Sequence, residues 1–77
     1  MALIRDFIQA SRQRYTTHQE IDAEYLCFQK DGKRLIQIDT FGRTTREQPG
    51  KLSQTIQLDK ESGFKLYQIL KNHFDFV

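Results

Sequence analysis

The residue types that could bind a metal are few and scattered in this 77-residue chain. His18, Glu20 and Asp22 form the only close cluster, with Cys27 and His73 further along the chain. Zinc sites need converging ligands at defined spacings such as Cys-x2-Cys or His-x3-His, and the sequence has neither spacing. We therefore interpret the cluster as a solvated loop, and we expect no metal and no cofactor.

Residues for catalysis are equally hard to find. Cys27 lies between Leu26 and Phe28 in a strand-like run, without the signature of a partnered thiolate. The glycines of the turns stand singly, so the sequence offers no phosphate-binding loop. No pair among the ten carboxylates is distinguished from the others as an acid and base pair. We expect no catalytic residues and no enzyme.

A more distinctive pattern is a local excess of positive charge. The formal net charge is only +2, but residues 30–51 hold six basic and three acidic side chains. Basic residues with nearby aromatic rings can follow a phosphate backbone and stack on bases. The candidate nucleic-acid-binding residues are Lys30, Lys33, Arg34, Arg43, Arg46, Lys51, Tyr25 and Phe41. The alternative is a solvated loop, because turns and exposed loops routinely collect Lys and Arg.

A β-hairpin is predicted where two strand-like runs, residues 25–29 and 34–40, flank the sequence Lys-Asp-Gly-Lys. A two-residue loop would pair Lys30 with Lys33, which sets two like charges opposite each other. A three-residue loop at residues 30–32, with Gly32 at positive φ in a bulge, would instead pair Leu26 with Ile36. We favour the three-residue loop.

This register, with a third strand at residues 52–58, predicts a sheet with two different faces. The inner face would hold Leu26, Phe28, Ile36, Ile38, Ile56 and Leu58. The outer face would hold Tyr25, Cys27, Leu35, Gln37, Asp39, Ser53, Thr55 and Gln57. The outer face is therefore mostly polar and uncharged, and the loop that follows Phe41 is exposed and basic.

Two helices complete the predicted fold. Apolar residues from Leu3 to Tyr15 recur at helical spacing, which predicts a first helix that ends between residues 14 and 17. Asp59 is placed to cap a second helix that contains Leu66, Ile69 and Phe74. The expected class is α+β: an N-terminal helix, a three-stranded antiparallel sheet with a hairpin at residues 30–32, and a C-terminal helix packed on one sheet face.

Length and composition favour a single domain over residues 1–77 that associates with itself. A domain this short has a marginal core unless something else covers apolar area. Apolar residues at the C-terminus, Phe74, Phe76 and Val77, also favour a homodimer. A single cysteine excludes an intrachain disulfide, and no membrane-spanning or signal-like run is present, so we expect a cytoplasmic protein without membrane contact.

One family resemblance rests on short motifs. These are Phe28-Gln-Lys-Asp-Gly-Lys33, Ile36-Gln-Ile-Asp39, Pro49-Gly-Lys51, Thr55-Ile-Gln-Leu58 and a final helix with Leu66 and Ile69. Over roughly residues 25–71 the chain resembles the positive cofactor four family of single-stranded DNA-binding transcriptional coactivators. The resemblance implies phosphate contacts from Lys33, Arg34, Arg43 and Lys51, a stacking surface at Tyr25 or Phe41, and a dimer built by the final helix.

Two functions follow as hypotheses. The first is a non-catalytic module that binds single-stranded nucleic acid through the basic hairpin and loop and the polar sheet face. The alternative is a protein-interaction or inhibitor module that uses an exposed strand edge or a helix face, as small accessory and phage-encoded proteins often do.

Overall fold

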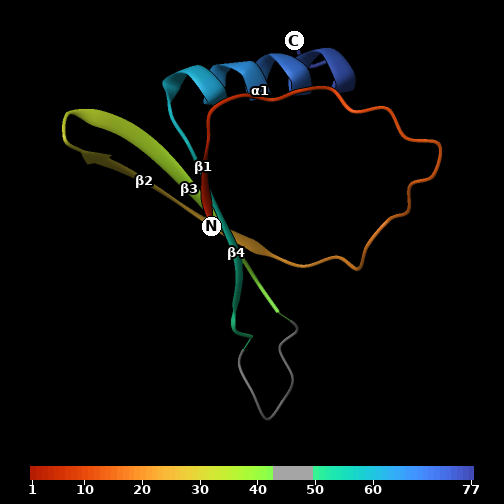
Figure 1. Ribbon diagram of the computed structural model, residues 1–77, viewed down its shortest axis with the longest axis horizontal. Coiled ribbons are helices and arrows are strands. Elements are labelled where there is room, and N and C mark those ends of the chain that lie inside the picture. The colour runs from red at the N-terminus through yellow and green to blue at the C-terminus, as the bar shows by residue number, and fades with distance from the viewer. Residues whose placement is uncertain (43–49) are drawn as a thin grey trace.

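The computed structural model describes residues 1–42 and 50–77. The element order is β1 (Ala2–Ile4), β2 (Ala23–Lys30), β3 (Lys33–Phe41), β4 (Leu52–Leu58) and α1 (Lys60–Phe74). The strands form one four-stranded mixed sheet in the order β1-β4-β3-β2 (Figure 1). β1 runs parallel to β4, and the other two pairs are antiparallel.

The predicted N-terminal helix is wrong, and so is the three-stranded antiparallel sheet. Ala2–Ile4 adds a parallel strand to β4, and residues 5–22 form neither helix nor strand. Ile8 and Tyr15, which were expected on the apolar face of that helix, are 87% and 89% exposed. A short helix is marginal in water unless its apolar face packs. Ile8 and Tyr15 have no such packing in the described part of the chain.

The predicted three-residue hairpin loop is also wrong. Asp31 and Gly32 form a two-residue turn with φ of 52° and 78°, and Lys30 pairs with Lys33. Positive φ at both turn residues is typical of the type I′ turn, which Asp-Gly favours because its twist matches the strands. Two lysines in water repel each other only weakly, by about 1 kcal/mol, so turn geometry decides the register.

The shifted register changes which β2 residues share a face with β3. Leu26 now lies opposite Gln37, and Cys27 lies opposite Ile36. The β3 and β4 residues divide as predicted, because Ile36 pairs with Leu58 and Gln37 with Gln57. One face therefore combines Leu26 and Phe28 with Leu35, Gln37, Asp39, Thr55 and Gln57. The other combines Tyr25 and Cys27 with Ile36, Ile38, Ile56 and Leu58.

The best-buried hydrophobic position lies at the end of β4. Leu58 is 4% exposed and has Ile36 of β3 on one side and Ile4 of β1 on the other. α1 begins immediately after it and contacts β4. The prediction that Asp59 caps this helix is confirmed. Among the described residues Leu58 is the one large hydrophobic side chain that is fully buried, so the hydrophobic core of the single chain is small.

Candidate interaction surfaces

Three of the basic residues that were predicted to bind nucleic acid, Lys30, Lys33 and Arg34, lie at the hairpin tip, but on both faces of the sheet. Lys30 and Lys33 are paired across the tip and share one face. Arg34, paired with Gln29, projects from the other face, because side chains alternate along a strand. Tyr25 shares the face of Arg34 and is 72% exposed.

The other predicted residues lie at the far end of β3. Phe41 pairs with Leu52 and is about 26 Å along the strand from Lys33, at the usual rise per residue. Lys51 is exposed, and its backbone carbonyl accepts a hydrogen bond from the Gly42 N–H at 2.8 Å. Arg43 and Arg46 lie outside the described residues. The described basic residues therefore do not converge on a single groove.

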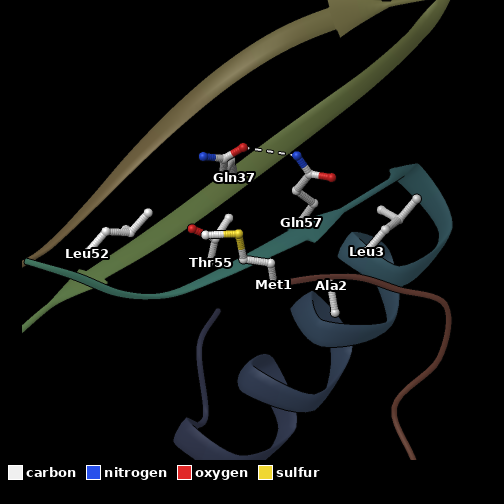
Figure 2. Close-up of a pocket in the computed structure, with 7 residues that line it drawn as sticks. All are labelled: Met1, Ala2, Leu3, Gln37, Leu52, Thr55 and Gln57. Carbon is white, nitrogen blue, oxygen red and sulfur yellow. Dashed lines mark hydrogen bonds between the residues drawn. The ribbon is translucent and has the colours of Figure 1, made fainter.

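A polar ladder crosses the sheet on the face of Lys33. We use this name for Gln37, Asp39, Thr55 and Gln57. The Thr55 hydroxyl donates to Asp39 Oδ1 at 2.7 Å, and Gln37 Nε2 donates to the same carboxylate at 3.1 Å. Gln57 Nε2 donates to Gln37 Oε1 at 2.9 Å (Figure 2). The hydrogen bonds from Gln57 to Gln37, from Gln37 to Asp39 and from Thr55 to Asp39 therefore all run toward the Asp39 carboxyl group.

A shallow pocket of about 400 Å³ lies over this ladder. Its lining residues are Met1, Ala2, Leu3, Gln37, Leu52, Thr55 and Gln57, all from the N-terminus and the sheet (Figure 2). No ionisable side chain lines it. The pocket offers amide and hydroxyl groups for hydrogen bonding and a few apolar side chains at its rim.

Several exposed apolar side chains lie on α1 and the residues that follow it. The apolar helix surface, as we call it, comprises Phe64, Tyr67, Ile69, Leu70, Phe74 and Phe76, which are 37% to 59% exposed. Its aromatic rings contact one another, with Phe64 stacked on Tyr67 at 6.0 Å and Phe74 on Phe76 at 5.7 Å between centroids. Exposed apolar side chains gathered on one element are typical of interaction sites.

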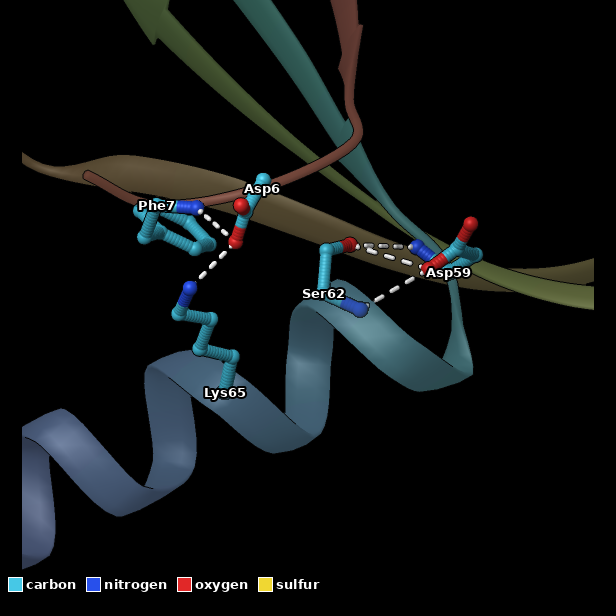
Figure 3. Close-up of polar contacts among 5 residues, drawn as sticks. All are labelled: Asp6, Phe7, Asp59, Ser62 and Lys65. Carbon is cyan, nitrogen blue, oxygen red and sulfur yellow. Dashed lines mark hydrogen bonds and ion pairs between the residues drawn. The ribbon is translucent and has the colours of Figure 1, made fainter.

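The N-terminus of α1 is fixed by polar contacts (Figure 3). The Ser62 N–H donates to Asp59 Oδ1 at 2.9 Å, and the Asp59 N–H donates to Ser62 Oγ at 3.1 Å. The Ser62 N–H bond is the main reason that the pKa of Asp59 lies below its ordinary 3.8. Lys65 forms an ion pair with Asp6, which lowers the pKa of that carboxyl group as well.

The exposed area of the chain is large for its mass. The chain exposes 7877 Å², whereas a folded monomer of this mass exposes about 4,900 Å². The radius of gyration is 15.1 Å, compared with about 11.5 Å for a compact domain of this length. The excess of roughly 3,000 Å² is more than the 800 Å² or so that one partner buries in a standard interface.

Two further sequence features can be placed. Cys27 is a free, exposed thiol in the edge strand β2. Among residues 1–42 and 50–77, no three His, Cys, Asp or Glu side chains are grouped as metal ligands. No helix in these ranges has the length and hydropathy that a bilayer crossing requires.

Sequence reasoning missed the N-terminal strand and the extended segment that follows it. Three residues are too few to show a strand period, and the segment has the apolar spacing of a helix. It also missed Phe64 as part of an exposed surface, although the helix itself was expected. Comparisons with protein-family models, curated proteins and solved structures found no match for this chain.

Proposed function

We propose that this chain is a non-catalytic protein-interaction module that works as a homodimer, with the apolar helix surface as its interface. The observation that carries the proposal is the excess of exposed area over that of a folded monomer. Burial of that area would supply the hydrophobic stabilisation that the small core of the single chain lacks.

The position of the surface supports α1 as the interface. α1 contacts β4 and Ser62 in its first turn is 1% exposed, while Phe64, Tyr67 and Phe74 are 51% to 59% exposed. A second α1 packed on these rings would give a two-fold interface in which the same patch meets itself. Aromatic side chains are the residues that most often dominate such interfaces.

Sedimentation velocity of the wild type and two variants tests the homodimer. The F64S/F74S double variant removes two rings of the apolar helix surface, and Q68S/N72S changes two exposed polar residues of the same helix. We expect wild type and Q68S/N72S at twice the chain mass of 9.2 kDa and F64S/F74S at the chain mass. Wild-type protein that stays at the chain mass at every concentration would contradict the proposal.

A second candidate function is binding of single-stranded nucleic acid, favoured by the paired lysines at the hairpin tip. Lys30 and Lys33 lie opposite each other, and a phosphate between them would relieve the repulsion of two like charges. The polar ladder and the exposed rim of the pocket lie on the same face. The split of Lys33 and Arg34 between faces is the reason that we place this function second.

Fluorescence anisotropy with a labelled oligonucleotide tests this second function. Affinity should fall with salt, with a slope of about −0.7 in log K against log salt for each phosphate neutralised. K30Q/K33Q should bind more weakly, and its salt slope should be smaller by the amount expected for about one to two phosphate contacts. R12Q/K60Q, which makes the same charge change elsewhere, should bind as the wild type does. Absence of binding at low salt would remove this candidate.

A further inference from the structure

The segment between β1 and β2, residues 5–22, is far longer than the connection requires. We call it the arm. Ile4 lies level with Leu58, and Ala23 lies level with Gln54, four residues away along the strand direction. β1 and β2 are also three strands apart across the sheet. At ordinary strand spacing and rise, these points are about 20 Å apart. Eighteen extended residues reach about 60 Å, so roughly a third of the arm would span the gap.

The arm does not use its extra length to pack against itself. Ile8 and Tyr15 are 87% and 89% exposed, and Ile21 is 52% exposed. Its side-chain hydrogen bonds within the arm join adjacent residues only, Asp6 with Phe7 and Thr16 with Thr17. Compact long loops are normally packed by their own side chains. The apolar side chains of the arm are therefore without packing partners in the single chain.

The arm is anchored beside α1 at its first residues. The Asp6 carboxylate pairs with Lys65 of α1, and Phe7 at this point is half-buried (Figure 3). Beyond this anchor the arm describes a wide arc before it joins β2 (Figure 1). The first residues of the arm are thus held beside α1, the helix that carries the apolar helix surface.

A second copy of the chain is the occupant that fits these features. The excess area of each chain exceeds what one helix-to-helix patch of standard size buries, so a dimer through α1 alone would leave further surface exposed. In a two-fold dimer through α1, the partner's helix lies beside the helix to which the arm is anchored, and symmetry places both arms alike. The apolar residues of the arm would then gain the packing that they lack in the single chain.

We propose that the arm crosses to the second copy and lies over its α1, so that Ile8 and Tyr15 are buried between chains. This inference rests on the proposed homodimer and adds a separate set of contacts to it. The arm would act as a clasp that holds the two helices together.

Photocrosslinking between chains tests the clasp directly. Unlabelled protein with benzoylphenylalanine in place of Tyr15 is unfolded and refolded with nitrogen-15-labelled wild type, and crosslinked peptides are read by mass spectrometry. We expect links from the unlabelled arm to labelled peptides within residues 60–77. The same probe in place of Gln29 is the control and should give no such links. A dimer whose Tyr15 probe links only within its own chain, or nowhere, overturns the clasp.

Dimer affinity gives a second, independent readout. I8S/Y15S should weaken dimerisation at least about tenfold by sedimentation equilibrium. Q9S/Q13S, which alters exposed polar residues of the arm, should leave it unchanged. Unchanged affinity in I8S/Y15S overturns the clasp but leaves the homodimer standing. A wild type that is monomeric at all concentrations overturns both.

Discussion

In the middle of the sheet, Leu58 is enclosed by a strand on each side, and Thr55 is 8% exposed with its hydroxyl bonded to Asp39. α1 presents the opposite picture. Its first turn is capped and Ser62 is 1% exposed, but the side chains of the apolar helix surface are 37% to 59% exposed. The sheet residues pack within one chain, whereas the apolar side chains of α1 and of the arm are exposed in the single chain, and a second copy is our proposal for what covers them.

This contrast distinguishes structure that is stabilised by residues close in sequence from an apolar surface that needs a second surface to cover it. A capping box and a type I′ turn stabilise a helix end and a hairpin with residues a few positions apart. Burial of an apolar helix face needs a second surface. Substitutions in the sheet should therefore change the stability of the fold, and substitutions on α1 or the arm should change association.

The largest expected effect is at Leu58, where L58A should lower the free energy of unfolding by about 2–5 kcal/mol. The residue is 4% exposed, and its truncation leaves a cavity between β1, β3 and β4. Urea unfolding followed by circular dichroism measures the change. L52A, at a 45% exposed position of the same strand, is the control and should cost much less. Equal losses in both variants would show that the sheet has no packed centre.

The polar ladder should contribute less than Leu58. T55V keeps the shape of the side chain but removes the hydrogen bond to Asp39, so we expect a loss of about 1–2 kcal/mol. Chemical unfolding measures this loss, and the dimer mass should not change. Q54V, at the exposed neighbouring position, is the matched control. A T55V protein as stable as the wild type would mean that the ladder is not a stabilising part of the sheet.

These sheet residues also show how far the sequence could predict the structure. Ile36 and Ile38 share a face, and so do Ile56 and Leu58, because side chains alternate along each strand. The β3–β4 register pairs Ile38 with Ile56, which puts all four on one face as expected. The β2 residues were assigned to the wrong faces, because one residue of loop length reverses every side chain. Repulsion between Lys30 and Lys33 was weighed too heavily against the turn preference of Asp31-Gly32.

The helix pattern of residues 3–15 failed for a different reason. Periodicity predicts a helix only when something packs on its apolar face, and that partner is not visible in one sequence. Asp59 and α1 were predictable because capping is local. The nucleic-acid residues were selected by closeness in sequence, although alternation along a strand already places Lys33 and Arg34 on opposite faces and Phe41 far from both.

At the α1 side, S62A should cost about 1 kcal/mol because it removes half of the capping box. The thermal unfolding midpoint at neutral pH measures the effect. S53A, at an exposed position of β4, is the control with the same chemical change. If S62A also leaves helix content and stability unchanged, the cap is not what fixes the start of α1.

The smallest expected effect is a decrease in the stability of the fold at low pH. The pKa values of Asp59 and Asp6 are lowered in the folded chain, chiefly by hydrogen bonds from Ser62 and Lys65 respectively. Their stabilising contribution is therefore present above the ordinary value of 3.8 and is lost as pH falls below it. Thermal unfolding between pH 6 and pH 2 should show this loss, and D6N/D59N should flatten it. An unaltered pH profile in the double variant would contradict the assignment.

Our proposal is that a second copy of this chain covers the apolar helix surface. Sedimentation equilibrium of the wild-type protein over a range of micromolar concentrations tests it most directly. We expect a species of twice the 9.2 kDa chain mass. A folded protein that stays at the mass of one chain throughout, with cooperative unfolding independent of concentration, would contradict it.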